Sequence, residues 1–81
     1  MMDKTDKLEW FLEIMKSKML RHQEDPNLLT EWEIIDWLEK EVAELKEALT
    51  YKSRENIILE SGDVANLAYF LARKVKGEWP R

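Results

Sequence analysis

Apolar residues recur every three or four positions along three stretches of the chain, which is the spacing of one face of an α-helix. The stretches run from about Lys7 to Arg21, from about Glu31 to Tyr51 and from about Arg54 to Lys76. Their apolar faces are, in this order, Leu8, Phe11, Leu12, Met15 and Met19; Ile34, Ile35, Leu38, Val42, Leu45 and Leu49; and Ile57, Val64, Ala65, Ala68, Leu71, Ala72 and Val75. The pattern predicts an all-α chain of three helices.

Residues with known preferences for helix ends support these boundaries. Pro26 lies between the first two stretches, where it removes a backbone donor and disfavours helix just before it. Thr30 and Glu33 form the Ser/Thr-x-x-Glu pattern of a capping box at the start of the second helix. Gly77 followed by Pro80 predicts the end of the third.

The second and third helices are separated by only a few residues around Lys52, so we expect them to form an antiparallel hairpin. Gly62 interrupts the third helix at a cost of up to ~1 kcal/mol relative to alanine. Close approach of another helix is one explanation for this glycine, and chance is the other.

The length of 81 residues allows a single domain, residues 1–81, that is small for an independent core. A chain of this size buries only about 60–65% of the surface that its unfolded form exposes. The usual supports are disulfides, a structural metal or a partner subunit. With no Cys and one His, disulfides and a zinc site are excluded. We therefore expect a homodimer or homotetramer whose four-helix-bundle core is built across subunits.

Charge and hydropathy narrow the functional classes. The net charge of −4 argues against binding of a nucleic-acid polymer, which needs a basic surface. No apolar run approaches the ~20 residues that span a bilayer, so we expect no membrane association. The absence of Cys is consistent with a cytoplasmic location.

Two pairs of acids, each spaced i, i+3, break the polar–apolar pattern of the second and third helices. Glu41 falls inside the apolar arc of its helix, with Glu44 at the edge of that arc. Glu60 lies inside the apolar stripe of the third helix, and Asp63 lies at its margin. Antiparallel packing would bring the two pairs to one level of the bundle.

Burying ionised carboxylates together costs several kcal/mol each unless a counter-charge is present. A hard divalent cation removes this conflict, and ligation by oxygen alone favours Mg²⁺, with Mn²⁺ as a substitute. A ferritin-like di-iron site is excluded because it needs Glu-x-x-His on two helices, and His22 has no Glu three residues before it. Any one of these acids alone is more typical of a solvated surface.

The arrangement Glu41-x-x-Glu44, then Glu60-x-x-Asp63, resembles the signature of the MazG-like, all-α nucleoside triphosphate pyrophosphatases. The strings LEKEVAELKEAL at 38–49 and LESGDVAN at 59–66 carry the likeness, which extends over residues 37–73. It implies a dimeric or tetrameric helical enzyme that hydrolyses nucleoside triphosphates to monophosphate and pyrophosphate. It further implies that the four acids hold Mg²⁺. Many members continue past the third helix, so we expect a neighbouring subunit to complete the site.

The resemblance and the chemistry suggest further site residues. A carboxylate that is not fully engaged by metal can activate the attacking water, and Glu41 is our candidate. Candidates for phosphate binding are Asn66, Arg73 and Lys74, and candidates for stacking on the base are Trp10, Phe11 and Tyr51. For the Trp residues, a place in the core or at a subunit interface is the more common role.

Three hypotheses remain open. The chain is either this enzyme or a catalytically inert helical oligomerisation or interaction module, whose acids form salt bridges at the surface. The third, weaker hypothesis is a magnesium-dependent hydrolase of the same fold that acts on another phosphorylated metabolite. Dependence on metal separates the first two, and a panel of substrates separates the first from the third.

Overall fold

The computed structural model describes residues 8–21 and 28–78, and this part of the chain consists of three α-helices without a strand. The helices are α1 (Glu9–Arg21), α2 (Glu31–Thr50) and α3 (Arg54–Glu78). The predicted all-α class is therefore confirmed. Within the described residues, no helix is both long and apolar enough to cross a membrane.

The start of α2 is fixed by the predicted capping box. The Thr30 hydroxyl oxygen accepts a hydrogen bond from the Glu33 backbone N–H at 3.1 Å, and Glu33 Oε1 accepts one from the Thr30 N–H at 3.0 Å. Two of the N–H groups that a helix leaves unpaired at its first turn are thereby satisfied.

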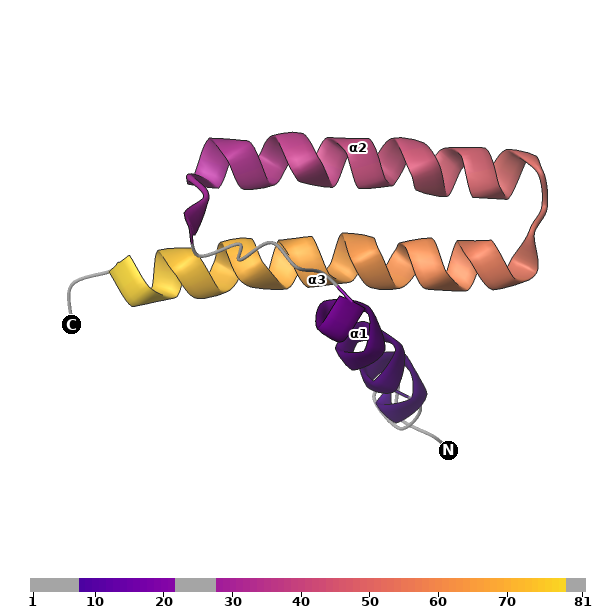
Figure 1. The fold of residues 1–81 in the computed structure, drawn as a ribbon, viewed down its shortest axis with the longest axis horizontal. Helices are drawn as coiled ribbons and strands as arrows, with labels where there is room; N and C mark the ends of the chain where they lie inside the picture. Colours follow the sequence, from indigo (N-terminus) through magenta and orange to yellow (C-terminus); the bar gives the residue numbers. More distant parts are fainter. Residues whose placement is uncertain (1–7, 22–27, 79–81) are drawn as a thin grey trace, which may run out of the picture.

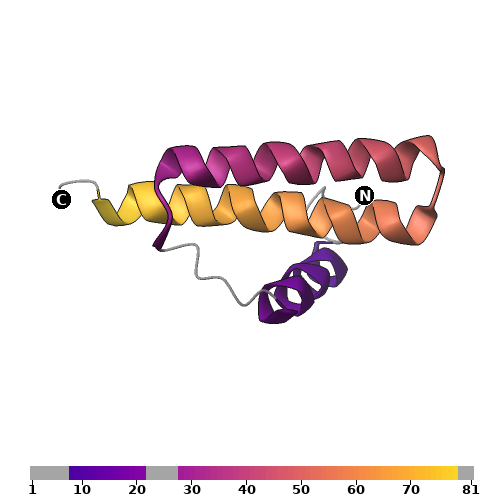
Figure 2. The ribbon, with the colours of Figure 1, turned by 45° about the horizontal axis from the view of Figure 1, so that its top comes forward.

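Figures 1 and 2 show α2 and α3 side by side and running in opposite directions. The turn between them begins as a Schellman motif, in which Ser53 N–H donates to the Ala48 carbonyl at 3.2 Å and Lys52 N–H donates to the Leu49 carbonyl at 3.1 Å. Lys52 adopts the left-handed conformation that this motif requires, with φ 55°. A lysine accepts this conformation at some cost, because its Cβ approaches the following carbonyl oxygen.

Helix α1 packs against α3 and crosses it at an angle (Figures 1 and 2). At the crossing, a Cβ on Gly62 would lie 2.9 Å from Ile14 Cγ2, closer than carbon atoms approach without displacement. A larger residue here would have to displace Ile14, so the structure favours the close approach of a helix as the explanation for Gly62. The next turn of α3 also holds α1, because Asn66 Nδ2 donates to the Met15 carbonyl at 2.9 Å.

The end of α3 differs from the prediction. We expected Gly77 to stop the helix, but α3 includes it and continues to Glu78. Gly77 has a negative φ, and a glycine ends a helix only where the backbone turns to the left-handed region. Pro80, the second stop signal, lies outside the described residues.

Few apolar side chains of the described residues are buried in the single chain. The buried apolar residues are Ile34, Ala48 and Leu67, and the buried polar ones are Glu41, Asp63 and Asn66. Several large apolar side chains are exposed instead, namely Leu8, Trp10, Leu12, Leu28, Trp32, Leu49, Tyr51 and Tyr69. The centre of this small bundle thus contains as many buried polar residues as apolar ones. Because burying polar groups costs stability, these residues are the candidates for a functional site.

Candidate metal centre

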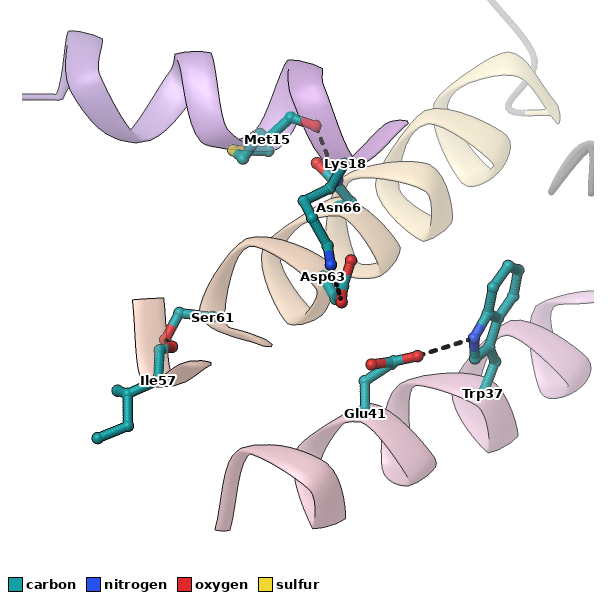
Figure 3. A network of polar contacts seen from close by, with 8 residues as sticks. All are labelled: Met15, Lys18, Trp37, Glu41, Ile57, Ser61, Asp63 and Asn66. Atoms are coloured by element: carbon teal, nitrogen blue, oxygen red, sulfur yellow. Dashed lines mark hydrogen bonds and ion pairs between the residues drawn. The ribbon is translucent and has the colours of Figure 1, made fainter. Parts of the chain in front are cut away.

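Three of the four predicted acids meet between α2 and α3. One carboxylate oxygen each from Glu41 on α2 and from Glu60 and Asp63 on α3 lie within 4.8 Å of one another. The i, i+3 spacing places Glu60 and Asp63 on one face of α3, and the carboxyl group of Glu41 points towards α3 from the facing helix (Figure 3). We call Glu41, Glu60 and Asp63 the acid cluster.

The acid cluster is largely shielded from water, and two of its carboxylate oxygens have no hydrogen-bond donor. Glu41 is 9% exposed and Asp63 is 6% exposed. Glu41 Oε1 accepts a hydrogen bond from the Trp37 indole Nε1 at 3.2 Å (Figure 3). Glu41 Oε2 and Glu60 Oε2 are buried without a hydrogen-bond partner. Buried oxygens of this kind cost free energy unless a proton or a cation satisfies them.

The surroundings disfavour the ionised form of two of these acids. Burial, followed by the neighbouring carboxyl group of Glu44 and by the charge of Asp63, raises the pKa of Glu41 to about 7. The indole N–H of Trp37 opposes this rise in the pKa. Burial also raises the pKa of Glu60, with the charges of Glu44 and Asp63 acting in the same direction.

The fourth predicted acid, Glu44, lies at the side of the acid cluster and is exposed. It contributes to a pocket of about 280 Å³ near the turn between α2 and α3. That pocket is lined by Glu44, Glu47, Ala48, Tyr51, Ser53, Asn56 and Glu60. Because Glu60 belongs to both, the pocket opens directly beside the acid cluster.

A hard divalent cation fits this set of groups. Every available ligand atom of the acid cluster is a carboxylate oxygen, which is the donor that Mg²⁺ and Mn²⁺ prefer. The unpartnered oxygens of Glu41 and Glu60 are free to take part. Opposite ligands of Mg²⁺ stand about 4.2 Å apart, since each bond is about 2.1 Å long. Small rotations of the carboxyl groups would therefore bring the three oxygens within reach of one cation.

One charged residue at this place is absent from the sequence-based prediction. Lys18 of α1 extends its ammonium group to Asp63, with Nζ 3.1 Å from Oδ2 (Figure 3). The available signal was weak: Lys18 follows Ile14 and Met15 by one helical turn, so it lies beside the residues that pack on α3. Helical periodicity does not indicate which helix such a lysine faces.

The predicted phosphate-binding residues lie in different surroundings. Asn66 is 1% exposed, and its amide nitrogen is engaged with α1, while its Oδ1 is buried without a hydrogen-bond partner. Arg73 and Lys74 come ten and eleven residues after Asp63 on the same helix, about 15 Å further along its axis. They are thus separated from the acid cluster of their own chain.

The three aromatic candidates lie at two different places in the structure. Tyr51 lines the pocket beside the acid cluster, together with Glu44 and Glu60. Trp10 and Phe11 are on α1, where their rings contact each other edge to face with centroids 5.6 Å apart. Of the three aromatic candidates, Tyr51 is therefore the one that shares a pocket with Glu44 and Glu60. His22 lies outside the described residues.

Comparisons with protein-family models, with curated proteins and with solved structures find no match for this chain. The likeness to the MazG-like pyrophosphatases therefore rests on the motif residues alone.

Proposed function

We propose that this chain is a magnesium-dependent nucleoside triphosphate pyrophosphohydrolase. The observation that supports this most is the acid cluster, in which three carboxylates from two helices converge and two buried oxygens have no hydrogen-bond partner. Without a cation or a proton, the two carboxylate oxygens that are buried without a partner cost free energy, so stability alone does not account for the arrangement. The motif that resembles the MazG-like family supplies the reaction type.

In this proposal Glu41, Glu44, Glu60 and Asp63 hold Mg²⁺, and Mn²⁺ can replace it. The bound cation would supply charge neutralisation for the triphosphate. Glu41, through a carboxylate oxygen that the cation leaves free, would accept a proton from the attacking water. The indole of Trp37 keeps the Glu41 carboxyl group in a fixed orientation through its hydrogen bond to Oε1.

The pocket beside the acid cluster is our candidate for the nucleoside. Its position next to Glu60 would allow a triphosphate to reach the acids while the base lies towards Tyr51. Phosphate contacts by Arg73 and Lys74 and base contacts by Trp10 and Phe11 remain part of the proposal. Asn66 is 1% exposed and bonded to the Met15 carbonyl, so its role is to hold α1 on α3 and it is no longer proposed as a phosphate contact. Arg73 and Lys74 would act on the site of a neighbouring subunit, given their distance along α3.

Assembly into a homodimer or homotetramer is part of the same proposal. Beside α2 and α3 lies an apolar groove of about 550 Å³, lined by Leu38, Ala68, Leu71, Ala72, Val75 and Lys76. Pairing of two such α2–α3 hairpins would cover these side chains and give a four-helix core across subunits. The enzyme would act on the cytoplasmic nucleotide pool, removing non-standard or surplus nucleotides.

The same groove favours a second candidate function, an inert helical interaction module. Such a module needs an exposed apolar surface, which the groove provides, and has no need of a metal. In this alternative the acid cluster is relieved by protonation, and replacing one acid by its amide leaves binding of partners unchanged.

Pyrophosphate release from a panel of ribo- and deoxyribonucleoside triphosphates, in Mg²⁺ and in EDTA, tests the proposal. The wild type should release pyrophosphate only with Mg²⁺, and Glu60→Gln should lose this activity while melting no lower than the wild type in EDTA. Glu55→Gln removes an exposed acid of the same helix and should behave as the wild type does. Other phosphorylated metabolites in the panel test the third hypothesis.

Release of pyrophosphate from none of the substrates, together with a melting temperature that Mg²⁺ does not change, would contradict the enzyme and favour the interaction module. Equal activity of Glu60→Gln and the wild type would contradict the assignment of the site.

A further inference from the structure

Lys18 brings a positive charge to the acid cluster from α1, a helix that contributes none of the motif acids. Its Nζ lies 3.1 Å from Asp63 Oδ2, and the side chains are 17% and 8% exposed. Ion pairs on protein surfaces are usually well solvated and weak. This ion pair joins two helices with little water around it. Removing one partner would therefore leave a buried charge and lower the stability of the fold considerably.

The lysine is held in place by the packing of α1. Its Cγ would lie 3.7 Å from a Cβ on Gly62, so the aliphatic stem passes over the glycine where α1 packs on α3. The hydrogen bond from Asn66 to the Met15 carbonyl fixes the adjacent turn of α1. The backbone of α1 is thus anchored independently of the ammonium group, which can move while the helix stays docked.

The charges at this place correspond to those of a cation site. When ionised, the three carboxylates of the acid cluster and the Lys18 ammonium together carry two negative charges, the amount that one divalent cation neutralises. An ammonium group that contacts Asp63 Oδ2 also covers one direction from which a cation could approach that oxygen. A divalent cation on the same oxygen would stand close to the ammonium group and repel it.

We propose that Lys18 is a tethered counter-ion that competes with the divalent cation for Asp63. It neutralises part of the acid cluster in the metal-free protein, and it leaves Asp63 when the cation binds, through movement of its side chain alone. The inference rests on the proposed metal centre but is independent of the reaction catalysed there. Lys18 is a positioning residue with two effects. It lowers the affinity of the site for the cation, and it stabilises the folded protein when no cation is bound.

The test compares Lys18→Met, which keeps an unbranched stem and removes the charge, with Lys16→Met as the matched control. Lys16 is on the same helix, and its contact to Glu13, at 3.7 Å, is exposed to water. The dissociation constant for Mn²⁺, measured by electron paramagnetic resonance of the free ion, should fall at least tenfold in Lys18→Met. It should remain at the wild-type value in Lys16→Met and stay near it in Lys18→Arg, which retains the charge.

Thermal melting gives a second readout that a merely structural lysine would not produce. In EDTA, Lys18→Met should melt below the wild type because Asp63 loses its counter-charge. With saturating Mg²⁺ the variant should reach or exceed the wild type, since the cation supplies that charge. If Lys18→Met is unfolded in EDTA, folding on addition of Mn²⁺ provides the same evidence, and failure to fold with Mn²⁺ overturns the proposal.

An unchanged or weaker affinity of Lys18→Met for Mn²⁺ would overturn the proposal and leave Lys18 as a packing contact. If the wild type binds no Mn²⁺, the metal centre and this inference both fail. If the wild type binds Mn²⁺ and Lys18→Met binds it more tightly, but neither protein releases pyrophosphate, the inference stands and the proposed reaction fails.

Discussion

Replacement of Glu41 by glutamine is the most direct test of the energetics of the acid cluster. Glu41→Gln keeps the size of the side chain and an oxygen that accepts from the Trp37 indole, but it cannot ionise. In metal-free protein the wild-type carboxyl group must either retain a proton or become charged beside Glu44 and Asp63. The variant avoids this choice, so we expect it to be the more stable protein above neutral pH.

The magnitude follows from the pKa of Glu41, which rises from its ordinary value of 4.5 to about 7 in the folded protein. A raised pKa means that the folded state favours the protonated acid, so the stability it contributes is fully present below pH 4.5. That stability is lost as the pH rises towards and through 7. Each pKa unit corresponds to about 1.4 kcal/mol of unfolding free energy. Because solvent reaches part of the carboxyl group, we expect the wild type to lose about 1–2 kcal/mol of this free energy.

Thermal unfolding in EDTA between pH 4.5 and 8.5, followed by circular dichroism, measures this effect. Wild type and Glu41→Gln should melt together at pH 4.5, and at pH 8.5 the variant should melt higher by about 5–15 °C, as 1–2 kcal/mol implies for a domain of this size. Glu39→Gln replaces an exposed acid of the same helix and should follow the wild type. Parallel melting curves for wild type and Glu41→Gln at every pH would refute the reasoning.

Three further substitutions test the fold. Gly62→Ala should lower stability or displace α1, despite the gain in helix propensity, because the new methyl group would meet Ile14 at 2.9 Å; denaturant unfolding checks this, and a more stable variant would contradict it. Thr30→Ala should cost about 1 kcal/mol by removing the cap on Glu33 N–H, measured in the same way. Lys52→Gly should raise the free energy of unfolding by about 1 kcal/mol, since glycine adopts a φ of 55° without strain; no change would show that the turn relaxes in solution.

Local features of the fold could be predicted because each depends on neighbours within one helical turn. The capping box needs Thr30 and Glu33 alone, and both of its hydrogen bonds are present. The phase of Glu41 and Glu60 follows from the fixed rotation of about 100° per residue, and these acids face the space between α2 and α3 as expected. Gly77 shows the limit of such signals, because a glycine permits a left-handed stop without enforcing it.

The sequence by itself determined the helical class, the start of α2 and which acids lie on apolar faces. Tertiary structure decided which groups meet those acids: Lys18 reaches Asp63 across 45 positions of sequence, and Asn66 holds the Met15 carbonyl instead of facing solvent. The physical reason is that helical phase is set by backbone geometry within each segment. The crossing of α1 over α3 depends on the close contact at Gly62, and no periodicity within either helix encodes where that contact falls.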